Sequence, residues 1–332
     1  MKKLHRIKLD GQEFTARSGQ VLLDAALMAC VDLPHDCRAG RCGACSTQVQ
    51  HGITLGGDTM RGDVVHACQA RVFSDLTLAI EQLPPVVQVE ARLINVVDLT
   101  PGVVELTIAP EQPLRILPGQ YCRFSFRGYP ARAFSPTMPL DGQAPGDRIF
   151  LNVKRVRDGR VSSGLGGKIR RGHHLNIEGP FGHAFLRTGR RNRLVLAGSG
   201  TGFAPIWAVA PTALHEDATR SVVIVAGARE LRELYMAPAL EFACRFPNVR
   251  IALTVEERHS SYQHVHVGRP SDHMPELNAD DIVYAAGAPK SVEIIGRLAM
   301  TAGATFFSDP FEPAGTESAD WLTRAAGWLR TG

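Results

Sequence analysis

Residues 36–45 read DCRAGRCGAC, and the tripeptide HAC follows at residues 66–68. The cysteines of these two stretches have the spacing C-x4-C-x2-C with a distant fourth member: Cys37, Cys42, Cys45 and Cys68. This is the arrangement in which four thiolates hold a plant-type [2Fe–2S] cluster. Gly40 and Gly43 give the loop the backbone freedom that lets three sulfur atoms converge. Structural zinc is the alternative, but zinc favours two closely spaced cysteine pairs, so the spacing predicts an iron–sulfur cluster.

Three further cysteines bring the total to seven in 332 residues. Cys30, Cys122 and Cys244 stand alone in apolar or strand-like contexts, and we expect them to be buried packing residues. Cys30 is the nearest rival as a cluster ligand, but its position late in an apolar helical pattern argues against that role. An odd number of cysteines in a chain of this length does not fit a secreted disulfide scaffold. We therefore expect a cytoplasmic protein.

The composition is that of an ordinary globular protein, with 44% hydrophobic and 21% charged residues. These fractions exclude global disorder, and the length suggests two or three domains. The sequence contains no run of 18 or more apolar residues, so it predicts no membrane-spanning helix. Polar residues interrupt the basic N-terminus at positions where a secretory signal would be apolar. The net charge is +4, and its positive excess falls in the middle third of the chain. A phosphate-bearing cofactor accounts for that excess, and we expect neither a nucleic-acid nor a membrane partner.

The pattern of strands and helices changes along the chain and divides it into four segments: 1–83, 84–189, 190–314 and 315–332. The first combines a hairpin at 4–17, a helix that Ser18 would cap, the cysteine loop and a strand at 72–80. Paired prolines at 84–85 mark a linker, after which short strands and frequent turns are typical of an antiparallel barrel. The third segment alternates apolar strands with helical patterns, which predicts a parallel α/β sheet. The last is a tail with a short amphipathic stretch.

Two motifs in the second segment suit a pyrophosphate. Arg132-Ala133-Phe134-Ser135 follows a strand, and a fixed guanidinium can bind a phosphate through two hydrogen bonds. The run GRVSSGL at 159–165 offers hydroxyl and backbone N–H groups at a glycine-led helix start. Each motif alone is a weak indication, because an arginine before an aromatic residue in a barrel is more often part of the surface packing.

The third segment opens with a buried strand at 193–197 that leads into GSGTGFAP (198–205) and a helical pattern. A glycine loop between a strand and a helix is the geometry in which backbone N–H groups receive a pyrophosphate. The loop does not follow G-x-G-x-x-G, so on its own it is a weak indication of a dinucleotide site.

Together these motifs resemble a known family. DCRAGRCGAC with HAC resembles a plant-type ferredoxin domain, and the later motifs resemble the R-x-Y-S, G-x-x-S-x-x-L and GGTGxAP signatures of ferredoxin–NAD(P) reductase-like modules. The domain order is that of the reductase components of Rieske-type aromatic-ring dioxygenases, such as those for naphthalene, benzoate or terephthalate. The resemblance implies a β-grasp (α+β) ferredoxin domain, an antiparallel β-barrel for FAD and a C-terminal α/β parallel-sheet domain for the nicotinamide nucleotide.

In that family, residues equivalent to the second segment's motifs touch the flavin. The resemblance implies that Arg132 contacts phosphate, that Phe134 lies against the isoalloxazine and that Ser135 reaches the flavin N5 region. Phe134 and Ser135 would therefore hold the catalytic positions. Further FAD contacts are implied for two short runs and a C-terminal aromatic residue: Asn152, Val153, Lys154, Gly159, Arg160, Val161, Ser162 and Phe311. Phe134 replaces the usual tyrosine, which removes one hydroxyl hydrogen bond and keeps the aromatic face.

The resemblance also assigns nicotinamide-nucleotide contacts to the third segment: Gly200, Thr201, Gly202, Pro205, Arg229, Gly287 and Pro289. Ala286 stands where the family has a cysteine beside the nicotinamide, which departs from the pattern. The run FFSDPF at 306–311 resembles the family's closing F/Y-x-D-x-F. Glu256 and Glu257 end the third strand of this segment and would repel a 2′-phosphate, so we expect NADH to be preferred over NADPH.

Electron counting supports the presence of all three cofactors. A reduced nicotinamide gives up two electrons as hydride, whereas a [2Fe–2S] cluster accepts one at a time, so a flavin must stand between them. We expect an NAD(P)H-dependent reductase that passes electrons through FAD and the cluster to a terminal Rieske-type oxygenase, or to an intermediate ferredoxin. The reductase of a soluble diiron monooxygenase for phenols or alkanes shares the architecture and is an alternative. A redox-sensing binding protein with the same cofactors is a third possibility, and only Ala286 favours it.

Overall fold

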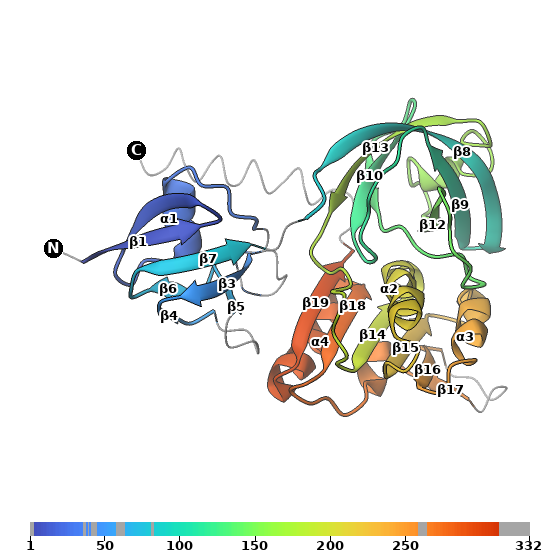
Figure 1. The fold of residues 1–332 in the computed structure, drawn as a ribbon. Helices are drawn as coiled ribbons and strands as arrows, with labels where there is room; N and C mark the ends of the chain where they lie inside the picture. The colour runs from blue at the N-terminus through green and yellow to red at the C-terminus, as the bar shows by residue number, and fades with distance from the viewer. Residues whose placement is uncertain are drawn as a thin grey trace.

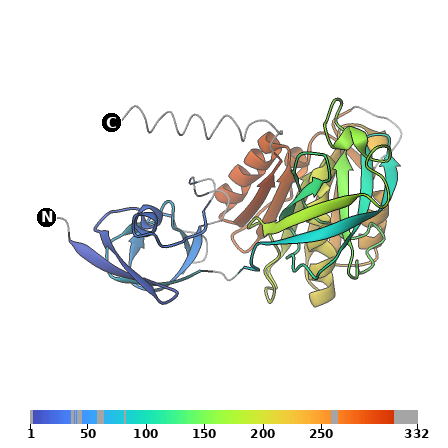
Figure 2. The ribbon, with the colours of Figure 1, turned by 90° about the horizontal axis from the view of Figure 1, so that it is seen from above.

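The computed structural model describes residues 3–35, 38, 40, 45–57, 64–80, 83–257 and 264–311. Three larger sheets follow one another along the chain, and the N-terminal one stands apart from two domains that pack together (Figures 1 and 2). No helix among the described residues has the length and apolar character needed to cross a membrane. The residues at which we divide the chain stay predictions.

The N-terminal domain is a mixed sheet covered by one short helix. Its elements are β1 (Leu4–Leu9), β2 (Gln12–Arg17), α1 (Leu22–Met28), β3 (Ser46–His51), β4 (Thr54–Leu55), β5 (Val64–His66), β6 (Arg71–Val72) and β7 (Leu76–Ile80). The sheet order is β2-β1-β7-β3-β5, with β1 parallel to β7 and the other pairs antiparallel. The apolar face of α1 is buried in the core of this sheet. This arrangement confirms the predicted β-grasp fold and the hairpin at its start.

Two local predictions for this domain are wrong. The residue that caps α1 is Val21 and not Ser18, whose backbone N–H instead donates to the carbonyl of Lys3 at 2.8 Å. The predicted strand at 72–80 is two strands, because the side chains of Ser74 and Asp75 accept hydrogen bonds from the backbone of other segments. The Ser74 hydroxyl accepts from the N–H of Ile53, and Asp75 accepts from that of Arg6. Short polar side chains of this kind compete with the strand ladder.

The second domain is a curled antiparallel sheet. Its elements are β8 (Val87–Thr100), β9 (Val103–Pro110), β10 (Tyr121–Phe126), β11 (Arg132–Phe134), β12 (Ile149–Lys154), the 3-10 turn η1 (Ser162–Gly164) and β13 (His174–Phe181). The described strands lie in the order β11-β10-β13-β8-β9-β12. A single bridge between Thr137 and Phe150 joins the segment after β11 to β12, which brings the two edges of the sheet together. The predicted antiparallel barrel is confirmed in this near-closed form.

The third domain is a parallel sheet with helices on both faces. Its elements are β14 (Leu194–Ser199), η2 (Gly200–Gly202), α2 (Phe203–Glu216), β15 (Val222–Ala228), η3 (Leu231–Glu233), α3 (Ala237–Ala243), β16 (Val249–Val255), β17 (Val265–Val267), η4 (Pro270–His273), β18 (Ile282–Gly287), α4 (Pro289–Ala302) and β19 (Thr305–Pro310). All described neighbours in the order β17-β16-β15-β14-β18-β19 are parallel. Buried residues of α2 and α3 pack on one face and those of α4 on the other. The predicted α/β domain is confirmed.

The second and third domains lie against each other (Figure 1), and buried side chains of both form one core. The indole N–H of Trp207, on α2, donates to the carbonyl of Pro139 in the second domain at 2.9 Å. The Tyr284 hydroxyl on β18 donates to the carbonyl of Phe185 at 2.8 Å. The Arg187 guanidinium lies 3.8 Å from the ring centres of both Phe185 and Phe307. These contacts fix the carboxyl ends of the parallel strands relative to the barrel.

Candidate functional site

The two predicted cluster ligands that the structure describes lie on adjacent segments. Cys45 and Cys68 are 3% and 8% exposed, and neither forms a disulfide within the described part of the chain. The N–H of Ala67 donates to the carbonyl of Cys45 at 2.9 Å, so the backbone before Cys68 runs beside Cys45. Buried thiols on touching segments suit ligation by thiolates. The other two predicted ligands, Cys37 and Cys42, lie outside the described residues.

The remaining cysteines are not all packing residues. Cys122 is fully buried, and burial raises the pKa of its thiol to about 12, as expected for an inert core cysteine. Cys30 and Cys244 are exposed, so the prediction for these two is wrong. The reason is that both helices are shorter than their apolar patterns. Helix α1 ends at Met28, and Cys30 lies in the turn beyond it at a φ of 56°, while Cys244 follows the last residue of α3.

The arginine–aromatic–serine motif lies on the edge strand β11, which pairs with β10. The Phe134 ring is partly exposed and lies 6.0 Å from the buried ring of Phe124, which supports it from behind. The Arg132 guanidinium donates to the carbonyl of Ala131 at 2.8 Å and forms no ion pair within the described part of the chain. An accessible guanidinium and a supported aromatic face are what a flavin and its phosphate require.

The neighbouring strand β12 presents a buried amide. Asn152 is 5% exposed, and neither its amide nitrogen nor its oxygen has a hydrogen-bond partner among the described residues. The Tyr235 hydroxyl faces this amide but donates to the carbonyl of Gly200 at 3.1 Å. A buried amide without partners is costly unless a ligand satisfies it. Val153 is buried in the barrel core and Lys154 is exposed at the end of the strand.

The predicted diphosphate loop is a tight turn that leads into η1. A Cβ on Gly159 would collide with the Ser162 hydroxyl, so only glycine fits there. The backbone N–H of Val156 donates to this hydroxyl at 3.1 Å, which holds the loop closed. Val161 is buried and Arg160 is exposed. The turn therefore offers backbone N–H groups and one exposed guanidinium to an anion.

The glycine loop of the third domain joins the carboxyl end of β14 to α2. Gly200 has a φ of 55°, and a Cβ on Gly202 would collide with the carbonyl of Ala286, so the loop lies directly against the end of β18. Thr201 is partly exposed between these two glycines. The first backbone N–H groups of α2, which have no carbonyl partner earlier in the helix, follow directly on this loop. This is the ordinary place for a pyrophosphate in such a sheet.

The end of β18 brings further predicted residues to the same point. The N–H of Phe311 donates to the carbonyl of Gly287 at 2.8 Å, and Pro289 begins α4 two residues later. A void of about 10 Å³ lies between α2, β18 and β19, and Pro205, Ala286 and Asp309 are among the residues that line it. That volume is about one water molecule. The position that the family fills with a cysteine is therefore next to a carboxyl group here.

Arg229 lies farther out, exposed beyond the end of β15. It forms no ion pair within the described residues, whereas its neighbour Arg232 pairs with Glu230 at 2.6 Å. Glu256, directly after the end of β16, pairs with Arg269 at 3.1 Å, and Glu257 is exposed. The unpaired guanidinium of Arg229 is the group at this edge that is available to a ribose or phosphate.

One hydrogen bond connects the flavin motif to the nucleotide domain. The Ser135 hydroxyl donates to a carboxylate oxygen of Asp309 on β19 at 2.9 Å. Burial raises the pKa of Asp309 to about 6, and the hydrogen bond from Ser135 partly opposes the increase. From the sequence, Asp309 is part of the closing FFSDPF motif, and no function was predicted for it. An acidic residue inside an aromatic C-terminal run was the available signal.

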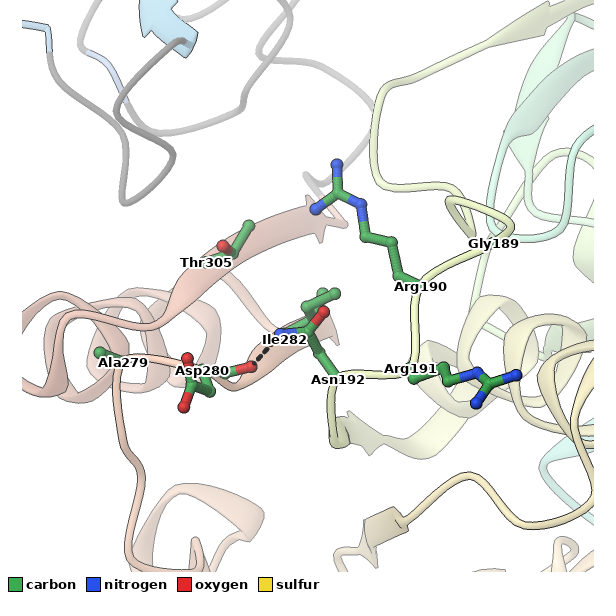
Figure 3. A pocket seen from close by; sticks show the side chains of 8 residues that line it. All are labelled: Gly189, Arg190, Arg191, Asn192, Ala279, Asp280, Ile282 and Thr305. Atoms are coloured by element: carbon green, nitrogen blue, oxygen red, sulfur yellow. Dashed lines mark hydrogen bonds between the residues drawn. The ribbon is translucent and has the colours of Figure 1, made fainter.

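A separate hollow of about 360 Å³ lies at the amino ends of the strands of the parallel sheet, opposite the end that carries the glycine loop (Figure 3). It is lined by the start of β18 and β19 and by the segment that enters β14: Gly189, Arg190, Arg191, Asn192, Ala279, Asp280, Ile282 and Thr305. The Asn192 amide donates to the carbonyl of Asp280 at 2.9 Å across it. Ligands of open α/β sheets bind at the carboxyl ends of the strands, so this hollow is not the nucleotide site.

Family models match three successive parts of the chain. The 2Fe-2S iron-sulfur cluster binding domain matches residues 7–73, the oxidoreductase FAD-binding domain residues 98–185 and the oxidoreductase NAD-binding domain residues 196–297.

Curated relatives match nearly the whole chain over nearly their own whole length. The chain is 30% identical over 323 residues to the ferredoxin–NAD(+) reductase component of the alkene monooxygenase system of Xanthobacter autotrophicus, covering 90% of this chain and 98% of that protein. It is 27% identical over 336 residues to the toluate 1,2-dioxygenase electron transfer component of Pseudomonas putida, with 92% and 98% covered. The solved ferredoxin reductase of carbazole 1,9a-dioxygenase matches in fold, with a TM-score of 0.63, 24% identity and coverage of 94% and 99%.

Proposed function

The chain belongs to the family of ferredoxin–NAD(P)(+) reductase components of oxygenase systems, and on this premise we propose that its electron acceptor is a Rieske-type aromatic-ring dioxygenase. It is an NAD(P)H-dependent oxidoreductase with FAD and a [2Fe–2S] cluster as cofactors. A bound flavin would supply the conversion between two-electron hydride chemistry and the one-electron chemistry of the cluster. We propose the cytoplasm as its location, because the free thiols and NADH both belong to a reducing compartment.

The contact between Ser135 and Asp309 is the observation that carries the catalytic part of this proposal. It joins the flavin motif on β11 to the strand beside Ala286 and Gly287, where the nucleotide loop also ends. A hydride donor and a hydride acceptor must approach to about 3–3.5 Å, and this is the point at which the two sets of predicted residues meet. Ser135 and Phe134 would orient the flavin ring from the barrel side.

The described residues fit the two nucleotide cofactors. On the barrel, Arg132 and the Gly159–Ser162 turn would hold the FAD phosphates, and Asn152 would satisfy its unpartnered amide on the cofactor. On the sheet, the N–H groups of Gly200–Gly202 would hold the nicotinamide nucleotide's pyrophosphate, and Arg229 its outer ribose or phosphate. Four thiolates, two of them from Cys45 and Cys68, would hold the cluster.

Reconstitution with separate oxygenase components tests the choice of partner. The purified reductase and NADH are mixed with the oxygenase of a Rieske-type aromatic-ring dioxygenase, with and without its ferredoxin, and dihydrodiol formation is measured against NADH consumption. We expect coupled product formation with the dioxygenase. A soluble diiron monooxygenase is the second candidate, since the alkene monooxygenase component is 30% identical along nearly its whole length. Coupled turnover with that oxygenase alone would refute the Rieske assignment and leave the reductase activity intact.

A further inference from the structure

The side chain of Gln69 joins two parts of the predicted cluster site. Its amide nitrogen donates to the carbonyl of Arg38 at 2.9 Å and lies 3.9 Å from the sulfur of Cys68, within the longer range of hydrogen bonds to sulfur. A glutamine amide carries two N–H donors, so one hydrogen can serve each acceptor. The two contacts connect the segment that follows Cys37 with the segment that holds Cys68.

The surrounding backbone is shaped to admit this side chain. A Cβ on Gly40 would lie 3.0 Å from Cγ of Gln69, so a larger residue at position 40 would displace the glutamine. Arg38 has a φ of 52°, and its guanidinium pairs with Asp24 of α1 at 2.9 Å. Arg38 is therefore held at two points, by Gln69 at its carbonyl and by Asp24 of α1 at its guanidinium.

The sulfur of Cys68 depends on protein groups for its hydrogen bonds. Cys68 is 8% exposed, so little water reaches its side chain, whereas Gln69 itself is exposed. Reduction of a cluster adds electron density to its sulfur ligands, and an N–H donor stabilises the electron-rich state more than the oxidised one. The same donor therefore raises the reduction potential.

We propose that Gln69 is a positioning residue that raises the reduction potential of the cluster through its N–H···S contact with Cys68 and orders the ligand loop through Arg38. The inference rests on the proposed function only in taking Cys68 as a ligand. The reaction it affects is the transfer of one electron from reduced flavin to the oxidised cluster, with no bond made or broken at Gln69. A higher cluster potential favours that transfer and lowers the driving force for the next one, to the oxygenase.

The test is an EPR-monitored potentiometric titration of the full-length holoprotein. Gln69→Leu removes both donors with little change in size, and Gln69→Glu removes them and adds a negative charge. Gln12→Glu is the matched control, because Gln12 is exposed on β2 at the opposite edge of the same sheet. We expect Gln69→Leu to shift the one-electron equilibrium about tenfold toward the oxidised cluster, which corresponds to a reduction potential about 59 mV lower. Gln69→Glu should lower the potential further. Gln12→Glu should have the wild-type potential.

Iron content and EPR intensity separate the possible failures. If wild-type protein binds no cluster, the proposed function is wrong, whatever the Gln69 variants do. If the wild-type signal is normal and Gln69→Leu has the wild-type potential, the role of Gln69 is refuted while the reductase assignment stands. If Gln69→Leu does not retain iron, Gln69→Glu decides, and a potential no lower than that of Gln12→Glu refutes the proposal.

Discussion

The hydrogen-bonded pair of Ser135 and Asp309 predicts a pH dependence for electron output. Oxidation of reduced flavin releases a proton, and the Asp309 carboxylate is the base next to the flavin motif. Its pKa is about 6 instead of 3.8 because it is buried. A rise of about two pKa units means that ionising the buried carboxyl group costs about 3 kcal/mol more free energy than ionising an exposed one. The carboxylate is therefore half ionised near pH 6 and about one-tenth ionised at pH 5.

Two substitutions shift this dependence in different ways. In the wild type we expect the rate of acceptor reduction to fall about tenfold per pH unit below pH 6, because only the carboxylate accepts a proton. Asp309→Asn has no titrating group, so this dependence disappears and the rate falls by about 10²–10⁴, the usual contribution of a general base. Ser135→Ala removes the hydrogen bond that lowers the pKa of Asp309, so the midpoint moves above 6.

Stopped-flow spectroscopy measures these rates directly. Protein reduced with NADH without oxygen is mixed with excess cytochrome c between pH 5 and pH 8, and flavin reoxidation is followed. Thr301→Ala is the control, since it removes an exposed hydroxyl that donates to the carbonyl of Arg297 on α4. An Asp309→Asn protein with the wild-type midpoint would refute the role of the carboxyl group. A Ser135→Ala midpoint below that of wild type would refute the direction of the coupling.

Three further predictions concern the cofactors one by one. Replacing any one of the four predicted ligands, Cys37, Cys42, Cys45 or Cys68, by serine should remove the cluster and leave flavin reduction by NADH unchanged. Iron content and visible absorbance measure the two effects. Arg132→Ala should weaken FAD binding about ten- to a hundred-fold, because a hydrogen bond to a charged group is worth about 1.5–3 kcal/mol. Titration of the apoprotein with FAD measures this, and an unchanged Kd would contradict the prediction. NADH should have the higher kcat/KM with ferricyanide, because the exposed Glu257 repels a 2′-phosphate and Arg232 is already paired with Glu230; a ratio favouring NADPH would reverse the assignment.

Long apolar runs made most of the fold predictable from the sequence. The strands β14, β15 and β18 read as nearly uninterrupted hydrophobic stretches, because parallel strands with helices on both faces are buried on both sides. The β1–β2 hairpin was equally clear from its alternating pattern around Gly11. Short or mixed elements carried no such signal. We did not predict β17, which is three residues long, or β19, in which buried Phe307 stands beside the polar residues Ser308 and Asp309.

Site residues with a motif were identifiable, whereas those defined by three-dimensional contacts were not. The ligand spacing of Cys45 and Cys68 is local chemistry that a sequence displays. The pairing of Ser135 with Asp309 joins residues 174 positions apart and depends on how the barrel meets the sheet. Asn152 is similar, because alternation along β12 places it on the face opposite Leu151 and Val153, and the sequence shows neither its burial nor that both amide atoms lack partners among the described residues.

The common core of the second and third domains restricts how nicotinamide can reach the flavin. Trp207 is fully buried between them, with its indole N–H on the Pro139 carbonyl, and Phe242 of α3 lies against Gly142 of the barrel. Separating the domains as rigid bodies would break this hydrogen bond and expose the part of the indole that does not pack on Phe203 and Phe242 of its own domain. A local displacement around Phe311, directly after β19, would leave this core intact, whereas a hinge between the domains would open it.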